Sequence, residues 1–192
     1  MKPIQLSFKL QECCGTKNQR IQNKNDMKRL KQLPIAIIGG GPIGLAAAAH
    51  LAKHGGSFIL LEAGENIGSN ILTWGHVRLF SSWQYNIDKA ALDLLEQSGW
   101  EAPDIKALPT GKEIVEKYLQ PLANLPEIKP FIHLNTKVLS IGKKDTDKMK
   151  TTNREKMPFM IYTEKEGVLQ AEPGEEPDER PAENQGENGE GG

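Results

Sequence analysis

A short apolar segment followed by glycines, residues 35–44 (IAIIGGGPIG), sets the fold class of this chain. Its first four residues are the continuously apolar run that is typical of a strand buried on both faces. The glycines predict a tight turn, and residues 42–54 predict an alanine-rich helix with Pro42 in its first turn and Gly55 just beyond its end. Residues 57–61 predict a second apolar strand, so the segment forms one strand–helix–strand unit.

The turn has the spacing G-x-G-x-x-G at Gly39, Gly41 and Gly44. The first glycine allows the tight turn, the second lets a pyrophosphate approach the backbone, and the third lets the helix pack against the strand. Free N–H groups at the helix start attract the anion. Glu62 ends the second strand, where its carboxylate can accept both hydroxyls of a ribose and would repel a 2′-phosphate. The unit therefore predicts binding of FAD or NAD rather than NADP.

The residues that follow this strand–helix–strand unit predict a loop and further helices and strands. We expect a loop over 63–86, a helix over 88–98 with Asp88 as its N-cap, and a helix opened by a capping box at Thr110 and Glu113. Three strands should follow, the last two joined by a turn, at 133–141, 158–163 and 168–171. The predicted fold is α/β: a Rossmann-like parallel sheet with helices, plus a small antiparallel meander.

Charge divides the chain into three parts. The net charge of −1 hides eight Lys and Arg before residue 34 and eight acids after residue 171, while the segment between them is neutral. We expect residues 1–32 to be a basic disordered leader, with Met27 as a possible true start. Residues 33–171 should be the nucleotide-binding domain, although an incomplete one. The acidic, glycine-rich residues 172–192 should be a disordered tail, since they have almost no apolar surface to bury.

Composition also excludes several classes of protein. A neutral central segment argues against nucleic-acid binding. Cys13 and Cys14 are adjacent, so they fit neither a disulfide scaffold nor a metal motif, and a cytoplasmic location is expected. Residues 33–52 lack charge, but their glycines and prolines argue against a membrane span. His50 and His54 have a metal-binding spacing without a third ligand, so no metal site is predicted.

The glycine turn, residues 61–64 (LEAG) and residues 74–86 (WGHVRLFSSWQYN) together resemble FAD-dependent oxidoreductases of the glutathione reductase and flavin monooxygenase type. The resemblance runs from about residue 34 to residue 171. It implies an FAD cofactor and gives candidate contacts for nine residues. These are the pyrophosphate turn (Gly39, Gly41, Pro42, Ile43, Gly44), the ribose acceptor Glu62 with Ala63 after it, Arg78 beside the cofactor, and Val138 on a strand near the adenine.

Several features of that family are missing from this sequence. It has no Ala-Thr-Gly-like turn after a closing strand, no Gly-Asp motif for the ribityl chain, and no second G-x-G-x-x-G for NADPH. We therefore expect the amino-terminal FAD-binding part of a flavoprotein, with a complementary carboxy-terminal part as a possible partner and no catalytic residue assigned. Two alternatives stay open: a non-catalytic remnant that binds nucleotides weakly or not at all, and a stand-alone NAD-binding domain.

Overall fold

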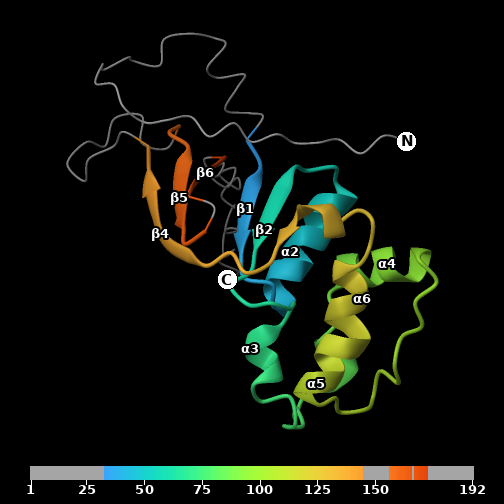
Figure 1. The fold of residues 1–192 in the computed structure, drawn as a ribbon. Helices are drawn as coiled ribbons and strands as arrows, with labels where there is room; N and C mark the ends of the chain where they lie inside the picture. Colours follow the sequence, from blue (N-terminus) through green and yellow to red (C-terminus); the bar gives the residue numbers. More distant parts are fainter. Residues whose placement is uncertain (1–32, 145–155, 166, 173–192) are drawn as a thin grey trace, which may run out of the picture.

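The computed structural model describes residues 33–144, 156–165 and 167–172. Within them two three-stranded sheets lie face to face, and most of the helices cover the other side of the parallel sheet (Figure 1). The parallel sheet has the order β1 (Ile35–Ile38), β2 (Phe58–Leu61), β3 (Ile132–His133). The second sheet is an antiparallel meander of β4 (Val138–Lys143), β5 (Phe159–Thr163) and β6 (Val168–Ala171). The predicted fold class is confirmed.

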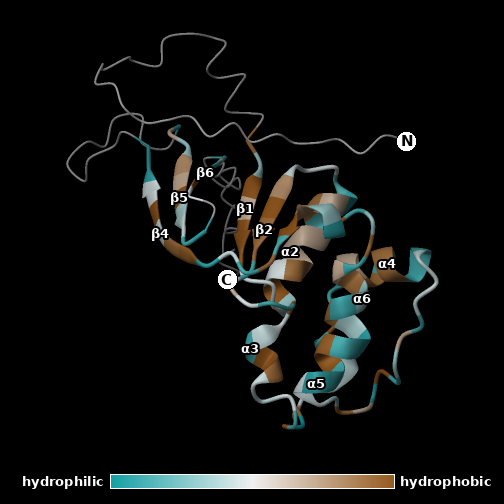
Figure 2. Ribbon diagram, viewed as in Figure 1, coloured by the Kyte–Doolittle hydropathy of each residue, from teal (hydrophilic) through white to brown (hydrophobic). Residues whose placement is uncertain are grey.

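The first strand–helix–strand unit matches its prediction closely. The strands β1 and β2 pair in parallel with Ile35 opposite Phe58, and they are uniformly hydrophobic in Figure 2. Between them runs α2 (Pro42–Lys53), whose alanines allow it to pack close to the sheet. Gly55 follows the helix with a φ of 69°, a left-handed conformation that glycine adopts without strain.

Two predicted elements need correction. The expected single strand over 133–141 is two strands in two different sheets, because the chain turns at Asn135, which has a φ of 54°. The loop expected over 63–86 contains a short helix, α3 (Ser69–Leu72), and the 3-10 turn η1 (Trp83–Tyr85). Asn135 is the kind of residue that tolerates a left-handed conformation, so it allows the chain to leave one sheet and begin the next.

The helical layer is built from α2, α4 (Lys89–Gln97) and one bent helix. Asp88 caps α4, as predicted, by accepting hydrogen bonds from the N–H groups of Ala90 and Ala91. The bent helix comprises α5 (Gly111–Ile114), the π-helical turn η2 (Val115–Leu119) and α6 (Gln120–Ala123). Pro121 stands in the first turn of α6, directly after the π-helical turn, where no N–H is required. A last 3-10 turn, η3 (Lys129–Phe131), leads into β3.

The capping box that opens α5 predicts a measurable acid sensitivity. The carboxylate of Glu113 accepts hydrogen bonds from the Lys117 ammonium at 2.8 Å and from the Thr110 N–H at 2.9 Å. These bonds lower its pKa to about 2, so its stabilising contribution is present above pH 4.5 and is lost as the pH falls toward 2. Glu113→Gln keeps a capping amide but loses the charge. We expect its melting temperature to be about 1–3 °C below that of the wild type at pH 7, with the gap closing below pH 4.5.

Thermal unfolding followed by circular dichroism between pH 3 and 7 measures that gap. Glu116→Gln is the matched control, because Glu116 pairs with Lys112 on the same helix without taking part in the cap. A gap that stays constant with pH in Glu113→Gln, or that is equally pH-dependent in Glu116→Gln, contradicts the prediction.

Candidate functional site

The glycine turn joins the carboxyl end of β1 to the start of α2. Gly39 has a φ of 100°, which only glycine adopts easily, and its N–H donates to the Leu61 carbonyl at 2.8 Å. At Gly44 a Cβ atom would lie 1.9 Å from the carbonyl oxygen of Gly39. Helix and turn therefore approach each other at a distance that no side chain permits. Both glycines are required by the backbone itself.

The start of α2 is open toward solvent at its N-cap. Gly41 occupies that position in extended conformation, and no side chain caps the helix. A Cβ atom built on Gly41 meets nothing within 4 Å. Pro42 follows at the first helical position, where it lacks only an N–H that has no intrahelical partner, and the side chain of Ile43 is 84% exposed. Free backbone N–H groups and the positive end of the helix dipole thus border open space beside Gly41.

The carboxylate of Glu62 is bound to the glycine turn. Its Oε2 accepts the Gly40 N–H at 2.5 Å, and its Oε1 accepts the Gly64 N–H at 2.8 Å. Each carboxylate oxygen has a second lone pair, so Glu62 can accept two further hydrogen bonds, such as those of a ribose diol. The two backbone bonds fix the carboxylate directly beside the turn.

A second turn closes around the residues that follow Glu62. The Asn135 N–H donates to the Gly64 carbonyl at 2.9 Å, and the Thr136 N–H donates to the Glu62 carbonyl at 2.8 Å. Ala63 lies exposed between these bonds. Val138 begins β4 two residues after Thr136 and packs, partly buried, between the two sheets. The predicted contacts of Ala63 and Val138 therefore come from one continuous neighbourhood, and their binding roles stay predictions.

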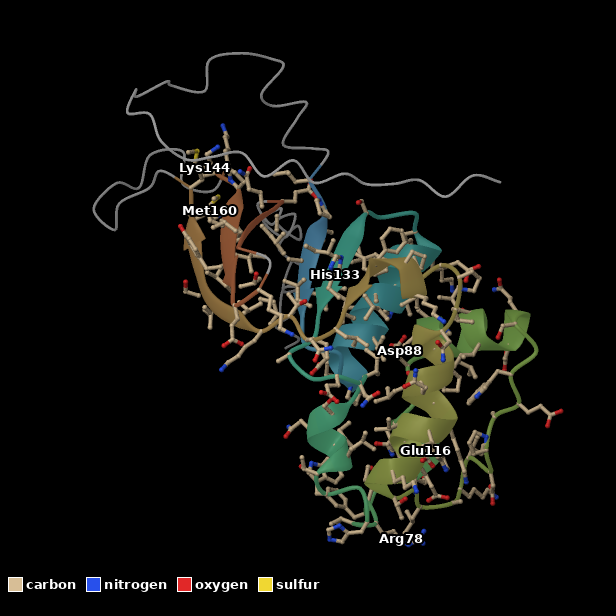
Figure 3. The ribbon with its side chains drawn as sticks, viewed as in Figure 1. Arg78, Asp88, Glu116, His133, Lys144 and Met160 are labelled. Atoms are coloured by element: carbon tan, nitrogen blue, oxygen red, sulfur yellow. The ribbon has the colours of Figure 1, made fainter. Side chains whose placement is uncertain are left out.

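Arg78 lies away from this neighbourhood. Figure 3 shows it at the end of the molecule beyond α3 and α5. Its backbone forms an isolated bridge with Thr110, and its guanidinium donates to the Leu108 carbonyl. This bond secures the loop between α4 and α5 to the segment before η1. The structure does not bring Arg78 close to the glycine turn, and its contact with the cofactor stays a prediction.

Two further glycines belong to the site and were not among the residues predicted from the sequence. Gly40, inside the turn, donates to Glu62 and accepts the Gly68 N–H at 3.0 Å, so it connects the turn to the start of α3. Gly64 approaches Ser69 so closely that a Cβ atom would lie 2.1 Å from its Oγ. The only signal in the sequence for the role of Gly64 was its position two residues after Glu62.

The described residues offer no other evident ligand or membrane feature. Within the three described ranges no group of three or more His, Cys, Asp or Glu side chains could hold a metal ion. His50 contacts Asp88 at 3.3 Å, which links α2 to the cap of α4. No helix in the described part of the chain is long and apolar enough to cross a membrane.

Known proteins with this architecture are flavoenzymes in several cases. The structure is similar to that of OTEMO in complex with FAD and NADP, with 20% identity, a TM-score of 0.53, and coverage of 73% of this chain and 24% of OTEMO. It is also similar to an oxidised steroid monooxygenase bound to NADP, with 20% identity, a TM-score of 0.54, and coverage of 72% of this chain and 24% of that protein. At this identity the likeness establishes the fold.

Other comparisons involve different chemistry. Bacillithiol disulfide reductase from Staphylococcus aureus shares 20% identity at a TM-score of 0.50, over 72% of this chain and 35% of the reductase. Thiamine thiazole synthase from Thermococcus kodakarensis is 33% identical over 75 residues, which are 39% of this chain and 28% of the synthase. The chain thus spans about a quarter to a third of the length of these proteins.

Residues 36–159, from β1 into β5, match the model of one protein family, described as pyridine nucleotide-disulphide oxidoreductase. The match includes the glycine turn, Glu62, nearly all of the parallel sheet and β4, and it extends over more than half of the chain. The chain therefore belongs to the pyridine nucleotide-disulphide oxidoreductase family.

Proposed function

We propose that this chain is the amino-terminal FAD-binding part of a monooxygenase-like, FAD-dependent oxidoreductase. The observation that carries the proposal is the direct hydrogen bond of 2.5 Å between the Gly40 N–H and the Glu62 carboxylate. This bond holds the Glu62 carboxylate beside the uncapped start of α2, and we assign that carboxylate to the ribose. In an adenosine diphosphate group the ribose and the pyrophosphate are also neighbours, so one ligand can reach both.

The residues present fit the adenosine diphosphate half of FAD. A pyrophosphate fits the open space beside Gly41, where the backbone N–H groups of α2 have no side-chain cap. The ribose hydroxyls fit the remaining lone pairs of Glu62, whose carboxylate is held in place from both sides by Gly40 and Gly64. The negative charge of Glu62 opposes a 2′-phosphate at the same position. This favours FAD over NADP as the ligand of this turn.

When bound, FAD supplies the electron-transfer chemistry, whereas the protein binds and orients it. In the proposed arrangement the glycine turn holds the pyrophosphate, and Glu62 and Ala63 hold the adenosine end. No described side chain is assigned as acid, base or nucleophile. Because the chain spans 24% of the length of OTEMO, we assign the binding sites of the electron acceptor and the substrate to a complementary carboxy-terminal part.

The visible absorbance of the purified protein tests the proposal directly. We expect a flavin spectrum as isolated, or after addition of FAD and desalting, and we expect ADP to compete with FAD because only the adenosine diphosphate half is bound by the turn. NADP should compete less well than NAD. Strong NAD binding without flavin favours a stand-alone NAD-binding domain, and absence of any nucleotide binding favours a non-catalytic remnant. Either result contradicts the proposal.

Replacement of the ribose acceptor should weaken binding without abolishing it. Glu62→Ala removes two charge-assisted hydrogen bonds to the ribose, so we expect FAD affinity to fall by about 1–3 kcal/mol. Fluorescence titration of FAD measures the change. Glu65→Ala is the matched control, since Glu65 is an exposed acid three residues further along. Equal affinity of the wild type and Glu62→Ala contradicts the assignment of Glu62 to the ribose.

A further inference from the structure

The turn between β3 and β4 is made by a residue in an unusual backbone conformation. Asn135 has a φ of 54°, and within the described ranges it is the one residue other than glycine with a positive φ. A side chain makes this left-handed region costly, and asparagine is among the few residues that tolerate it. The Asn135 side chain is exposed, so packing in the interior does not explain the choice of residue. The reason lies in the hydrogen bonds that this backbone conformation permits.

These hydrogen bonds depart from the ladder of the parallel sheet by one residue. The Glu62 N–H donates to the His133 carbonyl at 2.9 Å, and in a regular parallel ladder the Glu62 carbonyl would then accept the N–H of Asn135. Instead it accepts the Thr136 N–H at 2.8 Å, and the Asn135 N–H donates to the Gly64 carbonyl at 2.9 Å. Successive N–H groups of an extended strand point to opposite sides, so the turn at Asn135 is what directs both groups to the segment that follows β2.

The same segment carries the carboxylate that lies beside the glycine turn. The Gly64 N–H donates to Glu62 Oε1 at 2.8 Å, while the Gly64 carbonyl accepts the Asn135 N–H. Gly64 also faces Ser69, whose Oγ would lie 2.1 Å from a Cβ atom at position 64. Gly64 is thus held by its N–H, by its carbonyl and by the close approach of α3. The position of Oε1 depends on Gly64, and the position of Gly64 depends on the backbone of Asn135.

We propose that Asn135 is a positioning residue for the Glu62 carboxylate, and that its left-handed backbone sets the preference of this site for a ribose over a 2′-deoxyribose. The inference rests on the proposed function, in which Glu62 accepts the ribose hydroxyls. A hydrogen bond weakens steeply when its angle or length departs from the optimum, so a displaced carboxylate loses the hydroxyl contact while the pyrophosphate keeps its own seat at the helix start. Asn135 acts through its backbone and does not touch the nucleotide.

This role requires a backbone conformation and no particular side chain. Glycine adopts a φ of 54° without strain, alanine adopts it at a cost, and a β-branched residue is a true outlier there. Asn135→Val therefore favours an ordinary φ, in which the two N–H groups point to opposite sides and Gly64 is released. The series Asn135→Gly, Asn135→Ala, Asn135→Val removes the amide side chain in every member and makes the left-handed conformation steadily harder to adopt.

Isothermal titration of the full chain with ADP and with 2′-deoxy-ADP tests the proposal. The wild type should bind ADP at least about tenfold more tightly, because the 2′-hydroxyl donates to a charged acceptor, and Glu62→Ala should remove this preference. Asn135→Gly should keep the preference, Asn135→Ala should lower it, and Asn135→Val should reduce it to less than about threefold. Asn124→Val is the matched control, since it makes the same exchange at an exposed position with a φ of −83° and should bind both nucleotides as the wild type does. Circular dichroism verifies that each variant is folded.

Four results overturn the proposal, and they differ in what else they overturn. If Asn135→Val, or Asn135→Ala where the valine variant does not fold, prefers ADP as strongly as the wild type, Asn135 has no positioning role and the proposed function stands. If Asn135→Gly loses the preference as fully as Asn135→Val, the side chain itself contacts the nucleotide. If Glu62→Ala keeps the preference, the ribose contact lies elsewhere. If the wild type binds neither nucleotide, the proposed function fails together with this inference.

Discussion

Gly44→Ala is expected to destabilise the protein by about 3 kcal/mol or more, although alanine is the better helix former by about 1 kcal/mol. The reason is the approach of α2 to the glycine turn: the new methyl group would lie 1.9 Å from the Gly39 oxygen and 3.1 Å from its carbonyl carbon. Both are backbone atoms, so no side-chain rotation relieves the contact. The clash therefore outweighs the gain in helix propensity.

Urea unfolding followed by circular dichroism measures this loss. Gly41→Ala is the matched control, because it lies in the same turn with open space around the added methyl group and a φ of −86° that alanine adopts freely. We expect Gly41→Ala to unfold within about 1 kcal/mol of the wild type. Similar stability of Gly44→Ala and the wild type would mean that α2 does not pack on the turn as described.

Gly41→Val is expected to abolish FAD binding while the fold stays intact. Valine fits the extended backbone, and a Cβ atom at this position meets no neighbour within 4 Å, so stability should change little. The same open space is where the proposal seats the pyrophosphate, and the two methyl groups would occupy it. We expect an affinity loss of more than 100-fold, equivalent to about 3 kcal/mol.

Isothermal titration with FAD measures the loss, and thermal unfolding verifies the fold. Gly142→Val in β4 is the control: it also adds a valine where a Cβ atom meets nothing within 4 Å, on a different sheet. It should bind FAD as the wild type does. Normal FAD affinity in Gly41→Val would move the pyrophosphate away from the turn and remove the basis of the proposed function.

Elements that depend on neighbours in the sequence were predicted correctly, whereas features that depend on distant partners were not. Strands β1 and β2, the cap at Asp88 and the capping box at Thr110 depend on neighbours in the sequence, and the structure has them as predicted. The division of residues 133–141 between two sheets depends on a left-handed residue, Asn135, and on distant partners for each strand. Apolar residues occur on both sides of Asn135, at Leu134 and from Val138 onward, so the pattern suggested one strand and concealed the turn.

The sequence predicted which residues form the candidate site better than it predicted the contacts between them. Spacing alone indicated Gly39, Gly44 and Glu62. It did not indicate that Glu62 binds the Gly40 N–H, since that contact crosses 22 positions and depends on the register of β1 and β2. The contribution of Gly64 depends on the approach of Ser69, which belongs to a helix that was not expected.

The two faces of the parallel sheet also differ in the size of the buried cluster that covers them. The helices share a large buried cluster with one face, whereas the meander is joined to the other face by Ile59, Leu61, Ile161 and Ala171. Opening of the meander alone therefore costs only part of the global free energy of unfolding. The protein should behave as two cooperative units, in which the helix-covered half stays folded after the meander has opened. The turn at Asn135 and Thr136, which approaches Glu62, marks the border between the two units.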